Sequence, residues 1–169
     1  MTSYCIAYLW DGSPVPKEDQ VTIELVSQDN GDLLCSIHAP FYNDPAPKKP
    51  AGSMWELWNH EVVECFFVGK NGHYLEAEFG PHGHYLILKL DAPRSIIQRE
   101  LSVRYQATIE KDYWTGTVTI PSHYLPDSIE RFNLFSIHGT GSQRSYQCYS
   151  ALPGEKPDFH QPHRFPSYP

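Results

Sequence analysis

Apolar side chains recur at every second position along much of this chain. Between residues 62 and 68, for example, Val63, Cys65 and Phe67 stand at alternate positions. A period of two is typical of β-strands with one face in a core, whereas an amphipathic helix has a period of 3.6. The stretches that share this pattern are VTIELV, LLCSIHA, VVECFFV, HYLEAEFG, HYLILKL, SVRYQATIE, WTGTVTI and NLFSIHG. Since no long amphipathic helix is visible, the sequence predicts an all-β fold, an antiparallel β-sandwich of the jelly-roll kind.

Turns and irregular segments separate these strands. The sequences GKNG and GPHG join neighbouring stretches closely enough to form hairpins. Residues 40–53 contain four prolines, which exclude a central strand, so we expect a proline-rich loop there. Residues 151–169 are again rich in proline and have no period, and we expect this C-terminal segment to be irregular and to lie across the sandwich. A chain of 169 residues is expected to form one domain, residues 1–169.

The charge balance narrows the choice of partners. The chain has 13 Lys and Arg against 20 Asp and Glu, which gives a net charge of −7. Nucleic acids and anionic membranes bind to positive surfaces, so neither is an expected partner. No apolar run is long enough to cross a bilayer. The oligomeric state is left open.

The cysteines and the first residues bear on the compartment. Cys5, Cys35, Cys65 and Cys148 lie far apart and form no CxxC pair, which argues against a zinc knuckle. The first 20 residues lack the basic region and apolar stretch of a secretory signal. We therefore expect reduced thiols, a cytoplasmic location and no cofactor.

Carboxyl groups and aromatic rings alternate with the predicted core residues. Glu64 falls on the face opposite Val63 and Cys65, and Glu76 and Glu78 fall opposite their own core neighbours. If the two strands form a hairpin, these carboxyl groups share one face with Phe66 and Tyr74. Rings stack on the C–H faces of sugars and carboxylates accept hydrogen bonds from hydroxyl groups, so this face suits a sugar. The simpler alternative is that the glutamates face solvent.

Two tryptophans precede the strand at residue 62. Trp55 and Trp58 are spaced i, i+3, and His60 follows them. They either form a flat stacking wall for a ligand or cap one end of the core.

Nine histidines raise the alternative of a metal site. His82 and His84 form an HxH pair, which can chelate zinc or copper when it lies on a strand. His73 or Glu78 is a candidate third ligand. No spacing matches an established metal motif, so we predict no metal ligand.

Three blocks of the sequence resemble a known family. They are WNHEVVECFFVGKNGHYLEAEFGPHGHYL, then YWTGTVTIPSHYL with RFNLFSIHG, and finally PDFHQPHRF. Together they resemble a group of β-sandwich domains that are similar to the family 9 carbohydrate-binding modules and related to the DOMON domains. The resemblance covers about residues 55–166, and PDFHQPHRF is its most specific part. More narrowly, the whole chain is similar to a small family of intracellular animal proteins with no assigned activity.

The resemblance implies a sandwich that binds a sugar on its concave face or rim. Carried over by position, the ligand-binding residues that it implies are Trp55, Trp58, Glu64, Glu76, Asn133, Asp158 and His160. We add His60, which stands where many relatives carry an aspartate, and His138, which lies where relatives often carry an arginine. Asp158 and His160 are expected to complete a pocket with His38 or His138. The acidic residues that hold calcium in secreted members are not evident.

Three functions are compatible with these features. The first is a non-catalytic, carbohydrate-binding or small-molecule-binding β-sandwich. The second is an enzyme on the same fold, in which Glu64 or Glu76 acts with His160 or His138 as acid and base. The third is an adaptor, in which the PAPKKP sequence binds a partner domain as a polyproline II helix.

Overall fold

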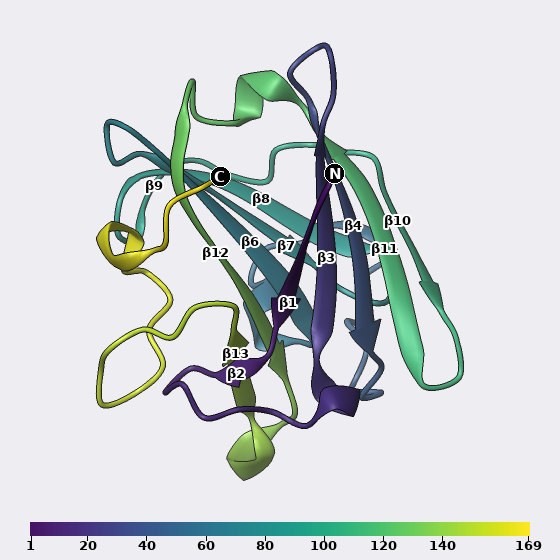
Figure 1. Ribbon diagram of the computed structural model, residues 1–169. Helices are drawn as coiled ribbons and strands as arrows, with labels where there is room; N and C mark the ends of the chain where they lie inside the picture. Colours follow the sequence, from purple (N-terminus) through teal and green to yellow (C-terminus); the bar gives the residue numbers. More distant parts are fainter.

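The computed structural model describes residues 1–169, which form two β-sheets packed face to face (Figure 1). The order in the five-stranded sheet is β1 (Thr2–Ile6), β3 (Val21–Ser27), β4 (Leu33–Pro40), β11 (Tyr113–Ile120) and β10 (Tyr105–Ile109). The order in the eight-stranded sheet is β2 (Tyr8–Leu9), β13 (Ser145–Cys148), β12 (Ile129–His138), β6 (Val62–Gly69), β7 (Tyr74–Phe79), β8 (His84–Ala92) and β5 (Gly52–Ser53), with β9 (Ser95–Gln98) paired to β8. All pairs are antiparallel except β5 with β8. The predicted all-β sandwich is confirmed.

Helical structure is limited to five single turns of 3₁₀ helix. These are η1 (Lys17–Asp19), η2 (Leu57–Asn59), η3 (Ser122–Tyr124), η4 (Gly141–Gln143) and η5 (Pro162–Arg164). None of them has the length and apolar character that a membrane-spanning helix requires.

The main core lies between the two sheets. The predicted alternation in β6 is confirmed, because Val63, Cys65 and Phe67 all point into this core. Trp114 of β11 enters it from the five-stranded sheet and is fully buried. Burial of side chains of this size is worth about 1.5–3 kcal/mol each, so this layer supplies most of the driving force for folding.

A second core covers the outer face of the eight-stranded sheet. The C-terminal segment, residues 149–169, runs along this face, at the left in Figure 1. Its Phe159 and Phe165 pack on the outward-facing Phe66 and Phe135. Phe135 and Phe159 stack in parallel, with ring centroids 3.9 Å apart. As a result, every residue of β6 and β7 is buried, on both faces of the sheet.

The proline-rich loop is fastened to the larger sheet. Both carboxyl oxygens of Glu61, which directly precedes β6, accept hydrogen bonds from the backbone N–H groups of Tyr42 and Asp44, at 3.1 and 3.3 Å. Nε2 of His84 lies 2.8 Å from the carbonyl oxygen of Lys49. The loop therefore follows the edge of the sandwich and ends in the short strand β5, which the sequence did not predict.

Candidate functional site

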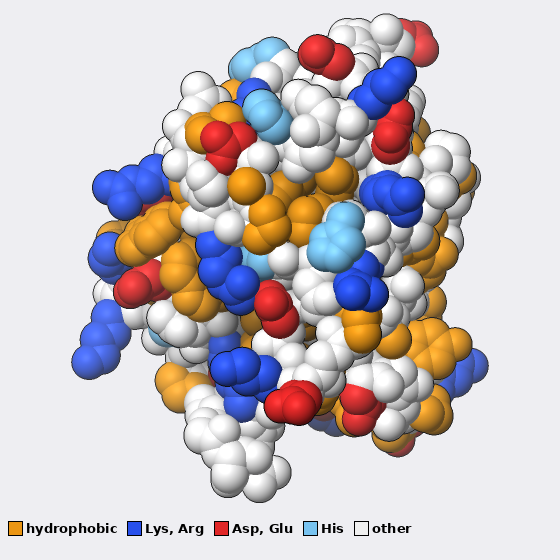
Figure 2. Space-filling model, turned by 90° about the vertical axis from the view of Figure 1, so that its left-hand side faces the viewer, with side chains coloured by type: hydrophobic (Ala, Val, Ile, Leu, Met, Phe, Trp, Pro, Cys, Tyr) orange, Lys and Arg blue, Asp and Glu red, His pale blue; other side chains and the backbone are white.

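A pocket of about 410 Å³ opens on the outer face of the eight-stranded sheet. Its polar lining residues are Glu64, Glu76, Arg94, Asp158 and His160. Its apolar and aromatic lining residues are Trp55, Trp58, Leu88, Leu90, Ile96, Ile137, Tyr146, Pro157 and Phe159. Strands β6, β7 and β8 thus form the floor, and the C-terminal segment, the turn into β9 and the chain before β6 form the walls. Figure 2 shows the side of the molecule on which the C-terminal segment lies, where acidic and basic side chains are interspersed around hydrophobic patches.

The two tryptophans form an aromatic wall. Trp55 and Trp58 pack edge to face, with ring centroids 5.1 Å apart. Two residues between them shape the turn. Glu56 has a positive φ of 63°, and the side chain of Leu57 is fully buried and anchors the turn to the sheet. The backbone carbonyl of Trp58 also accepts a hydrogen bond from Arg144. The i, i+3 spacing therefore serves to place the second ring beside the first.

The floor of the pocket carries carboxyl groups on neighbouring strands. In the register of β6 and β7, Glu64 lies opposite Glu78, and Phe66 lies opposite Glu76. Side chains at such direct and diagonal positions lie roughly 5–8 Å apart. Only 2% of Glu64, 4% of Glu76 and 0% of Glu78 is exposed. Oε2 of Glu76 and both carboxyl oxygens of Glu78 have no hydrogen-bond partner in the protein.

The alternative in which these glutamates face solvent is therefore wrong. The predicted alternation placed them correctly on the outer face, but that face is covered by the C-terminal segment and by the tryptophan turn. Whether an outer face is wet depends on what the rest of the chain lays over it, and alternation within one strand does not report this.

Burial raises the pKa of all three carboxyl groups. Removal from water is the main cause for each, since it disfavours the charged form. The pKa of Glu64 lies well above its ordinary value, with the charge of Glu76 as the second cause. The pKa of Glu76 rises to about 7. The pKa of Glu78 is also well above its ordinary value, because the charges of Glu64 and Glu76 add to its burial. At neutral pH this floor holds protons, so its carboxyl groups can donate as well as accept hydrogen bonds.

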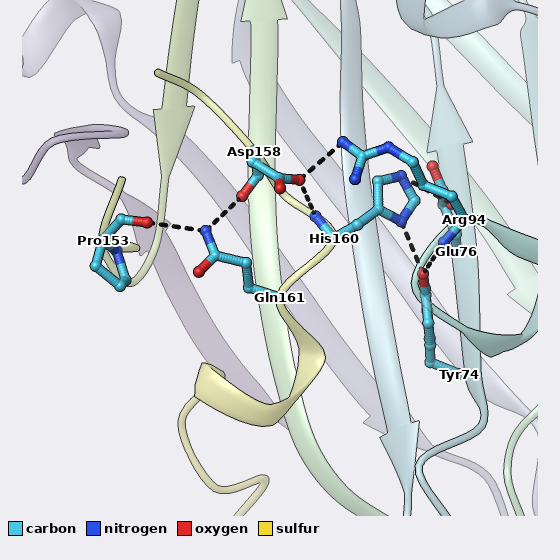
Figure 3. A network of polar contacts seen from close by, with 7 residues as sticks. All are labelled: Tyr74, Glu76, Arg94, Pro153, Asp158, His160 and Gln161. Atoms are coloured by element: carbon cyan, nitrogen blue, oxygen red, sulfur yellow. Dashed lines mark hydrogen bonds and ion pairs between the residues drawn. The ribbon is translucent and has the colours of Figure 1, made fainter. Parts of the chain in front are cut away.

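A polar network joins the floor to the C-terminal segment (Figure 3). The Arg94 guanidinium donates to Oδ1 of Asp158 at 2.9 Å, and the same oxygen accepts the His160 backbone N–H at 3.0 Å. Nδ1 of His160 lies 2.7 Å from the Tyr74 hydroxyl. Nε2 of His160 lies 3.9 Å from Oε2 of Glu76. The network fixes the PDFH sequence over the end of the pocket.

His160 is neutral in this setting. Burial and then the positive charge of Arg94 lower its pKa to about 4. The Tyr74 hydroxyl accepts the Arg94 backbone N–H at 3.3 Å, which leaves its own proton free to be donated to Nδ1 of His160. This arrangement favours the tautomer with the proton on Nε2, directed toward Glu76.

Six of the nine predicted site residues meet in the pocket, and three do not. Asn133 is fully buried, and it binds the backbone of Leu134 and Ser150 at the start of the C-terminal segment. His138 falls on the opposite face of β12 from Ile137, and its ring stacks on Tyr42 at 3.5 Å.

His60 lies outside the pocket, with Nδ1 3.4 Å from the carbonyl oxygen of Pro45. The expected pairing of Asp158 and His160 with His38 or His138 is wrong. His38 lies on β4 of the other sheet, where it stacks on Tyr113. His138 points to the opposite face of β12 from the pocket-lining Ile137.

Several lining residues had not been predicted. A signal was present for Leu88 and Leu90, because they alternate with the core residue Ile87 and therefore make both faces of β8 apolar. Such two-sided apolar character is typical of a sheet covered on both faces. Arg94 had no such signal. It reaches Asp158 because the turn between β8 and β9 gives it a positive φ of 62°.

The histidines do not assemble a metal site. No group of three or more His, Cys, Asp and Glu side chains is arranged to hold a metal ion. The HxH pair is engaged separately, with His84 at the carbonyl of Lys49 and the His82 ring packed edge-on against Phe41. All four cysteines are free thiols.

The fold and the pocket define a class, a β-sandwich with an aromatic-walled pocket on the outer face of its larger sheet. Its fold is similar to the crystal structure of a putative carbohydrate-binding protein from Bacteroides uniformis ATCC 8492, with a TM-score of 0.73. The similarity covers 99% of this chain and 85% of that chain at 14% sequence identity. At this identity the likeness shows the shared fold alone.

The chain belongs to the UPF0462 (C4orf33) family. It is 38% identical to the human UPF0462 protein C4orf33 over 172 residues, which cover 96% of this chain and 85% of the human protein. It is 39% identical to the homolog from Rattus norvegicus over 165 residues, which cover 92% of this chain and 82% of the rat protein. It is 36% identical to the homolog from Danio rerio over 167 residues, which cover 94% of this chain and 84% of the zebrafish protein. No family model matches the chain. The resemblance to an animal family with this kind of sandwich is confirmed.

Proposed function

We propose that this protein is a non-catalytic binding protein that takes a small, sugar-like molecule into the pocket of the eight-stranded sheet. One observation carries the proposal: a formed pocket of about 410 Å³ places an aromatic wall, Trp55 and Trp58, across from buried carboxyl groups. Ligand pockets typically measure roughly 300–1,000 Å³, mostly apolar with a few well-placed polar groups, and this pocket matches that description.

The two kinds of lining suit the two kinds of surface on a sugar. Indole rings offer flat apolar area for the C–H faces of a pyranose. Glu64 and Glu76 offer groups that accept and donate hydrogen bonds, and Arg94 and Asp158 stand at the rim. The similarity in fold to a bacterial protein described as a putative carbohydrate-binding protein supports the same proposal.

The acid–base alternative has less support. Its candidate His138 lies on the other face of β12, stacked on Tyr42. His160 lines the pocket, but its Nδ1 is engaged by Tyr74 and its Nε2 lies 3.9 Å from Oε2 of Glu76. A general base has to reach the proton that it removes, and this histidine is occupied by the protein itself.

A calorimetric titration with neutral mono- and disaccharides tests the proposal. We expect saturable binding, with a Kd of a millimolar or tighter, an affinity of at least about 4 kcal/mol. Replacement of both tryptophans by alanine should abolish it. Tyr113→Ala is the matched aromatic control, since Tyr113 is a half-exposed ring on the other sheet. The proposal fails if no sugar binds, or if the control variant loses binding as fully as the double variant.

A further inference from the structure

The acidic residues that line the pocket outnumber the basic ones. Glu64, Glu76 and Asp158 are its acidic lining residues, and Arg94 is its only basic one. Arg94 is committed to Asp158 at 2.9 Å. Arg144 is close enough to lower the pKa of Glu64, but it donates its hydrogen bonds to the backbone carbonyls of Trp58, His60 and Gly139. The two glutamates on the floor therefore lack a cationic partner.

The floor also contains a buried acceptor without a donor. Oε2 of Glu76 is shut off from water and accepts no hydrogen bond. A buried polar group without a partner destabilises the folded state, and more so if it is charged. Glu76 is more than nine-tenths buried and lines the cavity, so a ligand with donor groups can reach it.

The aromatic wall already holds a cation of the chain itself. The Arg99 guanidinium lies over the Trp55 ring, 5.1 Å from its centroid. Its side chain is 62% exposed and belongs to the segment after β9. A tryptophan face attracts cations through the ring quadrupole. The wall is thus suited to a positively charged group as well as to a sugar ring.

We propose that the ligand of this pocket carries a protonated amino group, which binds the Glu64 and Glu76 carboxyl groups while the rest of the ligand packs on Trp55 and Trp58. A sugar with a free amine is the simplest molecule that meets both requirements. This inference rests on the proposed function and names the class of ligand. It follows from two lining glutamates without an ion pair to arginine or lysine, one unpartnered buried oxygen of Glu76 and a cation-compatible wall in one cavity.

Proton release distinguishes this ligand from a neutral one. Burial holds the pKa of Glu76 at about 7 and raises that of Glu64, and an adjacent ammonium group favours their charged forms. Binding of an amine therefore expels protons into the buffer, and amine affinity rises with pH through this range while the amine stays charged. Other ionisable or charged groups that face the floor are Tyr74, Glu78, Arg94, Arg144, Tyr146, Asp158 and His160.

Calorimetry with three matched sugars tests the inference. Glucosamine, N-acetylglucosamine and glucose share a ring, but only glucosamine carries a charged amine. Titrations about one pH unit below the Glu76 pKa of about 7 keep the glucosamine amine charged, and two buffers with different ionisation enthalpies then measure the protons released. We expect glucosamine to bind at least about tenfold more tightly than the other two, and to be the one that releases protons.

Variants that remove a carboxyl group test whether Glu64 and Glu76 cause the preference for glucosamine. Glu64→Gln and Glu76→Gln keep the shape of the side chain, and each should weaken glucosamine binding by at least about tenfold more than it weakens glucose binding. Glu110→Gln, in an exposed turn of the other sheet, is the control and should leave every affinity unchanged. Thermal melting of each variant confirms that it is folded, and the three-sugar comparison on the natural protein needs no variant.

The outcomes separate the inference from the proposed function. Equal affinity for glucosamine and glucose, without proton release, overturns the inference and leaves the sugar-binding proposal standing. Binding of a simple alkylamine as tightly as glucosamine supports the amine and overturns the sugar-like ligand. If none of the four molecules binds, both proposals are wrong.

Discussion

At the scale of single residues, the unusual feature is a carboxyl cluster inside an apolar layer. Alternation along β6 and β7 predicts which face Glu64, Glu76 and Glu78 occupy, and the structure agrees. It does not predict their burial, because residues that cover them, Phe159 and His160, lie between 81 and 96 positions further along the chain. The pairing of His160 with Tyr74, and of Arg94 with Asp158, depends on the same distant segment and has no local signal.

The pKa of Glu76 predicts a pH-dependent contribution to stability. Its folded value is about 7 against an ordinary 4.5, so between these values the folded state binds more protons than the unfolded state. The contribution is fully present below pH 4.5 and is lost as the pH rises through about 7. The shift is worth on the order of 3 kcal/mol. Glu76→Gln should gain roughly that amount over the natural protein across this window, measured by urea unfolding at several pH values.

His160 changes the stability with pH in the opposite direction. Both the natural protein and Glu76→Gln contain His160, so its contribution is left out when the two pH profiles are compared. Its folded pKa of about 4 lies below the ordinary 6.5, so stability falls as the pH drops through that range in both proteins. Glu110→Gln serves as the control and should follow the natural protein at every pH. Parallel pH profiles for Glu76→Gln and the natural protein would show that Glu76 is ionised in the folded state.

At the scale of elements, the C-terminal segment decides the character of the larger sheet. The sequence predicts the long strands and their hairpins, because their alternation and turn residues are local. It does not predict the short strands β1, β2, β5, β9 and β13, which have two to five residues. Strands β2 and β13 pair with each other from distant parts of the chain, whereas β9 pairs with β8 directly before it. The irregular C-terminal segment was predicted, whereas its role as one wall of the pocket follows only from the packing of Phe159 and Phe165.

Truncation of the packed ring should loosen this segment. Phe159→Ala removes a side chain stacked on Phe135 at 3.9 Å, and we expect a loss of about 3 kcal/mol in the free energy of unfolding. Amide hydrogen exchange in β6 and β7 should rise, since the layer that covers their outer face is weakened. Arg94→Ala is a useful contrast, because its pair with Asp158 is substantially exposed and contributes at most about 1 kcal/mol. Equal losses in the two variants would mean that apolar packing does not hold the segment.

At the scale of the whole molecule, the chain builds one sandwich with two apolar layers. One layer joins the sheets, and the other joins the larger sheet to the C-terminal segment. The pocket lies in the second layer, where Glu64, Arg94 and His160 meet from three distant parts of the sequence. The likeness in fold to the Bacteroides uniformis structure agrees with the sandwich architecture.

Direct contact between the ligand and the aromatic wall is the central claim, and intermolecular NOEs measure it. In a complex with glucosamine, the account predicts NOEs from the ring protons of Trp55 and Trp58 to the C–H protons of the sugar. The rings of Tyr113 and His38, which stack on the outer face of the other sheet, should give none. NOEs confined to that other sheet, or a bound sugar with no NOE to either tryptophan, would contradict the account.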